Sequence, residues 1–192
     1  MADARERILE ATYACIARYG IGKTTVEDAA REARMSRATV YRYFPGGKDQ
    51  LIAEVIHWEV QRFFLRLAEA VAGASTFAEL LEEGLLFAHR AVEDHAVLQK
   101  VLQTEPERFL PQLTVESQRL VEPIATFVQG YLRSEDLQPG VEPRDAADYV
   151  ARMILSYINA QGGWDLSDRQ QVRELVRLEF LSGLVRGVTP DT

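Results

Sequence analysis

Residues 24–45 read TTVEDAAREARMSRATVYRYFP, and this stretch decides how the chain folds. Thr25 precedes a run of small apolar residues at helical spacing, and a hydroxyl before such a run is a common helix N-cap. Ser36 can cap a second short helix in the same way, and this helix should end where a proline follows it. The stretch therefore predicts two short helices, about 26–33 and about 37–44, joined by a tight turn.

Helical periodicity continues on both sides of this pair. The sequence predicts a helix over about 3–19 before it, which Gly20 ends, and a long helix over about 48–71 after it. No run of alternating apolar and polar residues predicts a strand. Further helices are expected near 77–92, 96–103, 113–133, 144–160 and 169–186, with capping-box matches at Thr76-x-x-Glu79 and Ser167-x-x-Gln170. The fold is therefore predicted to be all-α, with about nine helices.

Charge is distributed unevenly along the chain, whose net charge is −7 over 192 residues. Residues 1–50 contain nine Lys or Arg and seven Asp or Glu, a net +2, whereas residues 51–192 carry a net −9. Within residues 33–48 the charged side chains are all basic: Arg34, Arg37, Arg42 and Lys48. Binding to DNA phosphates needs such local positive charge, so the acidic total does not exclude a nucleic-acid partner.

Two helices joined by a tight turn suit an arrangement in which the first braces the second in the DNA major groove. The apolar side chains of the pair are mostly small, so the helices can approach closely: Val26, Ala29, Ala30, Met35, Ala38, Val40 and Phe44. Between them stand side chains that can contact DNA: Arg37, Thr39, Tyr41, Arg42 and Tyr43. Arginine can bond guanine, and threonine and tyrosine can bond phosphates. A plain helical hairpin with solvated arginines is the alternative.

With these residues the chain resembles the TetR family of transcriptional regulators. The resemblance covers roughly residues 8–55 and rests on Thr24-Thr25-Val26-x-x-Ala29-Ala30, on Ser36-Arg37-Ala38-Thr39-Val40-Tyr41-Arg42-Tyr43-Phe44-Pro45 and on Lys48-Asp49-x-Leu51. It implies DNA contacts at Thr25, Arg37, Ala38, Thr39, Tyr41, Tyr43 and Lys48. Arg34, Ser36 and Arg42, in the same turn and helix, complete the predicted DNA-binding set.

Two positions depart from the family pattern. Arg34 stands where the turn usually carries a glycine, so we expect a left-handed backbone there, at a cost of order 1 kcal/mol. The segment Pro45-Gly46-Gly47 is one residue longer than the commonest family form, which affects the reach of Lys48.

The resemblance also implies a division into a helix-turn-helix DNA-binding domain, residues 1–47, and a helical effector-binding and dimerisation domain, residues 48–192. One helix-turn-helix reads few base pairs, so such modules usually act as symmetric pairs on half-sites about 34 Å apart. We expect a homodimer on a palindromic double-stranded DNA operator and, by resemblance, a repressor that a small effector releases from DNA. An effector-independent or activating regulator is the alternative, and a helical scaffold protein is a weaker one.

The resemblance places the dimer interface on the last two helices. The expected interface residues lie along or beside the apolar stripes of these helices: Ala147, Val150, Ala151, Ile154, Ile158, Val172, Leu175, Val176 and Glu179. An effector pocket would be mostly apolar and suited to an acyl, sterol-like or aromatic compound. Its expected lining is Phe63, Phe64, Phe87, His89, Phe109, Phe127, Tyr131, Met153 and Tyr157. For both sets the alternative is ordinary core packing. Apolar periodicity cannot distinguish core residues from residues of an interface or a pocket.

Other classes of protein receive little support from the sequence. The three histidines do not form a His-Glu-x-x-His motif, Cys15 is the single cysteine, and no glycine-rich phosphate loop occurs. We therefore expect no catalytic residues, no metal and no cofactor, so the protein is not predicted to be an enzyme. No apolar segment is long enough to span a membrane and no signal peptide is recognised, so a cytoplasmic protein is expected.

Overall fold

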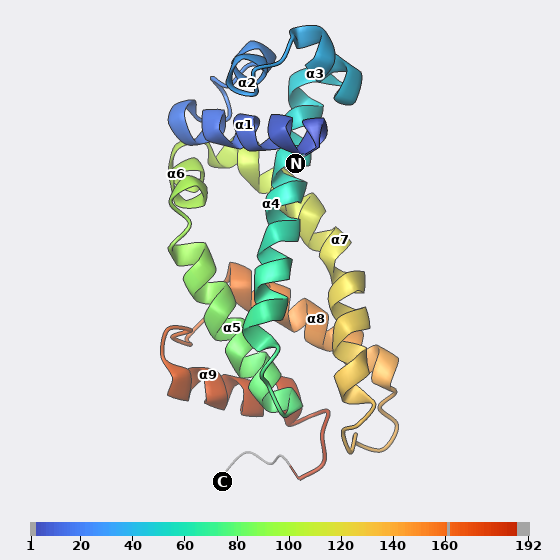
Figure 1. Cartoon of the computed structure of the whole chain (residues 1–192). Coiled ribbons are helices and arrows are strands. Elements are labelled where there is room, and N and C mark those ends of the chain that lie inside the picture. Colours follow the sequence, from blue (N-terminus) through green and yellow to red (C-terminus); the bar gives the residue numbers. More distant parts are fainter. Residues whose placement is uncertain (1–2, 161, 188–192) are drawn as a thin grey trace. The chain divides into compact units, whose positions relative to one another are not determined.

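The structure, a computed structural model, describes residues 3–160 and 162–187, apart from the side chains of Leu113 and Asn159. In these residues it consists of helices joined by loops, without a β-strand, which confirms the all-α prediction (Figure 1). In chain order the elements are α1 (Ala4–Tyr19), α2 (Val26–Glu32), α3 (Arg37–Tyr43), α4 (Gly47–Val71), α5 (Phe77–Glu93), α6 (Ala96–Thr104), α7 (Pro106–Leu132), α8 (Pro143–Asn159), α9 (Arg169–Leu175) and the π-helical segment η1 (Val176–Leu181).

Contacts within the chain divide it into two compact units. Unit 1 comprises Met1–Phe64 and His95–Glu116, and unit 2 comprises Leu65–Asp94 and Ser117–Thr192. Unit 1 thus holds α1, α2, α3, most of α4, α6 and the first turns of α7. The predicted boundary after residue 47 concerns a division of function and stays a prediction.

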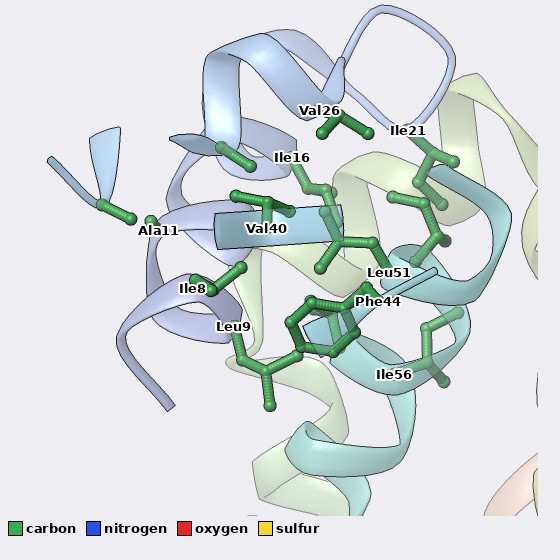
Figure 2. Packing of buried hydrophobic residues seen from close by; sticks show 14 of the residues in the cluster. Ile8, Leu9, Ala11, Ile16, Ile21, Val26, Val40, Phe44, Leu51 and Ile56 are labelled. Carbon is green, nitrogen blue, oxygen red and sulfur yellow. The ribbon is translucent and has the colours of Figure 1, made fainter. Parts of the chain in front are cut away.

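Apolar side chains from six helices form one buried cluster in unit 1. Figure 2 shows Ile8 and Leu9 of α1 close to Val40 and Phe44, which belong to α3 and the residue after it. Phe44 is only 1% exposed. Burial of a side chain of this size stabilises the fold by roughly 1.5–3 kcal/mol. The apolar face of α3 is therefore held against α1, and its opposite face is left to solvent.

Unit 2 has a separate core, in which α8, α9 and η1 contact α5. Val150 of α8 and Phe180 of η1 are fully buried there. The loop between α7 and α8 is tied to the segment after η1, because the Gln138 N–H donates to the Leu184 carbonyl at 2.8 Å. These contacts join elements that are distant in the sequence into one body.

Two predicted helix limits were wrong. The helix expected to begin near residue 113 begins at Pro106, where proline is favoured because the first helical N–H needs no partner. The final helix was expected to continue to about residue 186, but α9 ends at Leu175 and the chain continues as η1 to Leu181. The apolar periodicity of this region did not reveal the change of helix type.

One of the two later capping predictions was also wrong. Thr76 caps α5 by accepting a hydrogen bond from the Glu79 N–H at 3.1 Å, as expected. Asp168, not Ser167, caps α9, because its carboxylate accepts from the Gln170 N–H at 2.8 Å. The Ser167 hydroxyl instead donates to the Asp165 carboxylate at 2.6 Å.

Candidate nucleic-acid interface

The predicted helix-turn-helix is formed by α2, the turn after it and α3. Thr25 and Asp28 make a complete capping box: the Thr25 oxygen accepts from the Asp28 N–H at 3.1 Å, and the Asp28 carboxylate accepts from the Thr25 N–H at 3.2 Å. Ser36 caps α3 by accepting from the Thr39 N–H at 3.1 Å. Each cap satisfies an unpaired N–H of a first helical turn, worth about 1 kcal/mol. Both predicted caps are confirmed.

The turn between the two helices is closed by backbone hydrogen bonds around Arg34. The Met35 N–H donates to the Ala30 carbonyl at 2.9 Å, and the Arg34 N–H donates to the Arg31 carbonyl at 3.1 Å. This pattern is the Schellman motif, which requires a left-handed residue at its centre. Arg34 has φ of 55°, so the expected left-handed backbone is confirmed. The turn keeps the geometry that a glycine would provide, with a basic side chain added.

None of the ten predicted DNA-binding residues is buried. Seven are exposed: Thr25, Arg34, Ser36, Arg37, Ala38, Tyr41 and Arg42. Three are partly buried: Thr39, Tyr43 and Lys48. α2 and α3 lie next to each other (Figure 1, blue), so unit 1 gathers these residues around one helix-turn-helix. Whether they touch DNA stays a prediction.

Arg37, the first residue of α3, pairs with a carboxylate from α2. Its Nη1 lies 2.5 Å from Oε1 of Glu27, and the two side chains are 59% and 50% exposed. The acid of this pair lies outside residues 33–48, which is why the sequence indicated a wholly basic surface. The pair restrains the guanidinium that the sequence assigned to base recognition.

Two aromatic residues of α3 have different environments. Tyr41 is 41% exposed, and its ring lies beside Gly47, where an added Cβ would be 3.5 Å from Cε1 of the ring. Tyr43 packs against the buried cluster, while the Arg42 guanidinium lies over its ring at 5.2 Å from the centroid. Tyr41 therefore has the larger surface available to a ligand, and Tyr43 also has a structural role.

Lys48 is directed at the loop between α1 and α2. Its ammonium group donates to the Gly22 carbonyl at 2.7 Å. The N–H of Gly22 donates to the carboxylate of Glu105, which lies between α6 and α7, at 2.6 Å. The N–H and the C=O of Gly22 are thus both hydrogen-bonded to side chains from other parts of unit 1. The loop that leads into α2 is fixed from two sides.

Glu27, Gly22 and Glu105 are residues of this region that the sequence reasoning missed. The first-turn position of Glu27 indicated only a favourable interaction with the helix dipole. Glu105 lies in an acidic stretch typical of exposed helix ends, although its side chain is only 17% exposed. Their partners are 10 and 83 residues away in the sequence, and no local pattern reports such pairs.

The predicted effector-pocket residues are divided between the two units. Phe63 and Phe64 stack edge to face in unit 1, with ring centroids 5.2 Å apart. Phe109 is also in unit 1, where it is 8% exposed within the buried cluster, so it is an ordinary core residue of that unit. The remaining six lie in unit 2: Phe87, His89, Phe127, Tyr131, Met153 and Tyr157.

Most of the predicted dimer-interface residues face the core of unit 2. Six of the nine are buried within the single chain: Ala147, Val150, Ala151, Val172, Leu175 and Val176. Ile154 and Ile158 are partly exposed and Glu179 is exposed. The apolar stripes of α8 and α9 therefore contribute these six residues to the core of the single chain, and the assignment of a dimer interface to these helices stays a prediction. A partner chain would contact other side chains of these helices.

Other chemistry in the described part of the chain is sparse. Cys15 is 1% exposed in the core, and this burial raises the pKa of its thiol, in keeping with a core role. The described residues contain no group of three or more His, Cys, Asp or Glu side chains that could hold a metal ion. Among the described helices, none is both long and apolar enough to cross a membrane.

Residues 8–55, which include α2, α3 and their caps, match the family described as bacterial regulatory proteins of the tetR family. This part of the chain is thus similar to the N-terminal, DNA-binding part of TetR-family transcriptional regulators. This match confirms the family resemblance over residues 8–55 and the predicted helix-turn-helix. The family match itself covers only the N-terminal part of the chain.

Relatives and solved structures extend this likeness over more of the chain. The uncharacterised HTH-type regulator YhgD of Bacillus subtilis is 20% identical over 95% of this chain and 97% of its own length. The structure of the R. erythropolis transcriptional repressor QsdR, of the TetR family, is 18% identical with a TM-score of 0.64, covering 98% of this chain and 97% of that one. A putative regulator from Saccharomonospora viridis in complex with choline is 18% identical with a TM-score of 0.53, covering 95% and 98%. At these identities the structures support the TetR fold alone.

Proposed function

We propose that this chain is a TetR-family repressor. It binds a palindromic operator as a homodimer, and a small apolar effector releases it from DNA. The observation that carries the proposal is the position of α3. Val40 and Phe44 anchor its inner side in the core, while Arg37, Tyr41 and Arg42 stand exposed on its outer side. A helix fixed in this way can enter a major groove without losing its packing. Repression is also supported by the likeness to QsdR, a repressor.

Two half-sites are proposed because the reading surface of one chain is small. α3 has seven residues, so few of its side chains can reach base edges at once. For the contact between two chains we propose the outer sides of α8 and η1. Tyr149 is 41% exposed there, and its hydroxyl donates to the Glu179 carbonyl at 2.7 Å, which joins the two elements. Ile154 and Ile158 of α8 are also partly exposed.

The effector is proposed to bind among the aromatic residues of unit 2. Phe127 and Tyr131 pack together with centroids 5.5 Å apart, and Tyr157 packs on Phe180 at 5.7 Å. Such surfaces bind apolar or cationic groups, and the likeness to the regulator solved with choline is in keeping with a small ligand. His89, which is partly buried, would supply a polar contact.

The spacing of two half-sites tests the proposal. A duplex is first selected by the full chain from a random library, and its binding is compared with that of a duplex carrying five extra base pairs at the centre. A dimer should lose most of its affinity for the lengthened duplex, because half a helical turn places the second half-site on the opposite side of the DNA. Equal affinity for both duplexes, or a strict monomer at micromolar concentration, would contradict the proposal.

A further inference from the structure

The ion pair between Glu27 and Arg37 joins the two helices of the helix-turn-helix on their exposed side. Glu27 lies in the first turn of α2 and Arg37 is the first residue of α3. The two charged groups are 2.5 Å apart, and more than half of the Arg37 side chain remains exposed. The acid therefore stands beside one of the exposed basic groups that are predicted to contact DNA.

The other acids of α2 have different partners. Asp28 bonds the Thr25 cap and pairs with Arg31 on the same helix at 2.5 Å. Glu32 pairs with Arg18 of α1 at 2.7 Å. Neither of these pairs involves α3. Removal of the charge at position 27 therefore alters a contact of the recognition helix, whereas removal of the charge at position 32 does not.

A carboxylate beside an interfacial arginine affects two kinds of DNA contact unequally. The guanidinium of Arg37 has five N–H donors, and a guanine edge takes two of them, so donors remain for Glu27 when a base is bound. A phosphate contact instead brings a second anion toward Glu27, and the two negative charges repel each other. Phosphate contacts dominate binding to DNA of arbitrary sequence. The carboxylate therefore disfavours non-specific binding more than it disfavours binding to the correct base.

We propose that Glu27 is a specificity-determining residue of the DNA interface. Its carboxylate orients Arg37 for a guanine edge and weakens the contact of Arg37 with phosphate. This inference rests on the proposed operator binding by α3. Glu27 acts through Arg37 and is a positioning residue, so its removal changes the ratio of two affinities rather than the fold.

Glu27→Gln tests the inference, since it removes the charge and keeps the shape of the side chain. The full chain first selects a duplex from a random library, and affinity is then measured for this duplex and for a scrambled duplex of equal composition at several salt concentrations. E27Q should bind the scrambled duplex roughly 3- to 10-fold more tightly at low salt, with a salt slope steeper by about 1. The ratio of selected to scrambled affinity should fall, and a library selected by E27Q should show a weaker guanine preference at one position.

Glu32→Gln is the matched control, because it removes the same charge from the same helix but from a pair with Arg18. E32Q should leave the ratio of affinities within about twofold of the wild type, whereas E27Q should lower it further. In an R37A background, E27Q should have no further effect on the ratio. An unchanged ratio in E27Q, an equal fall in E32Q, or an undiminished effect without Arg37 would each overturn the inference. Failure of the wild-type chain to select any sequence would instead overturn the proposed function, and this inference with it.

Discussion

Lys48 donates a hydrogen bond from its ammonium group to the carbonyl oxygen of Gly22 at 2.7 Å. The N–H of the same glycine donates to Glu105 at 2.6 Å. These two bonds fix the loop that leads to the N-cap of α2, so the position of α2 depends on a carboxylate located between α6 and α7.

Glu105→Ala should destabilise unit 1, because it leaves the partly buried Gly22 N–H without its acceptor. The expected loss in the free energy of unfolding is about 1–3 kcal/mol, the cost of leaving a buried donor without a partner. Glu105→Gln keeps an acceptor oxygen and should lose less. Urea unfolding of both variants measures the difference, and equal stability of the wild type and both variants would show that this bond does not hold the loop.

Lys48→Met should change DNA binding as well as stability. Loss of the bond to Gly22 should cost about 1 kcal/mol of stability, and loss of a phosphate contact should lower the salt slope of DNA binding by about 1. Lys100→Met is the control, because Lys100 also donates to a backbone carbonyl of unit 1, that of Ala17 at 2.8 Å. Lys100→Met should reduce stability without altering the salt slope of DNA binding. If both variants have the wild-type slope, Lys48 does not bind phosphate.

Arg34→Gly should be as stable as the wild type or more stable by up to about 1 kcal/mol, because glycine adopts a left-handed backbone without strain. Arg34→Ala keeps the Cβ at φ of 55° and should show no such gain. If the Arg34 guanidinium binds a phosphate, the salt slope of DNA binding should fall by the same amount in both variants. Thermal unfolding compares the stabilities, and an R34G chain less stable than R34A would refute the strain at this turn.

The capping box predicts a dependence of stability on pH. The hydrogen bond from the Thr25 hydroxyl, followed by that from Arg31, holds the pKa of Asp28 below its ordinary value. A lowered pKa in the folded chain means that the stabilisation is present at neutral pH and is lost as the pH falls below about 4. The wild type should therefore exceed Asp28→Asn in stability at pH 7, and the difference should shrink at pH 3. A difference that is constant between these pH values would contradict this role of Asp28.

The sequence predicted those parts of the fold that local chemistry decides. Thr25 and Ser36 mark helix starts because their hydroxyls bond N–H groups three residues on, and these starts agree with the structure. The left-handed turn at Arg34 was instead expected from the family resemblance, which places Arg34 where the turn usually carries a glycine.

Long-range packing decided the features that the sequence did not reveal. The apolar stripe containing Val150 suited either a core or an interface, and only its burial in unit 2 separates the two. Phe109 belongs to the core of unit 1 although it lies far along the chain from α1. The pairing of Glu27 with Arg37 likewise depends on how α2 and α3 pack, which no spacing rule specifies.

The central claim is that the exposed side of α3 binds DNA in a sequence-selective way. Its most direct test is the affinity of the wild-type chain and of Arg37→Ala for the selected duplex and for a scrambled one, measured at several salt concentrations. The wild type should prefer the selected duplex, and R37A should bind it more weakly by roughly 1–3 kcal/mol with unchanged thermal unfolding. A wild-type chain without sequence preference at low salt, or an R37A variant with wild-type affinity, would contradict the claim.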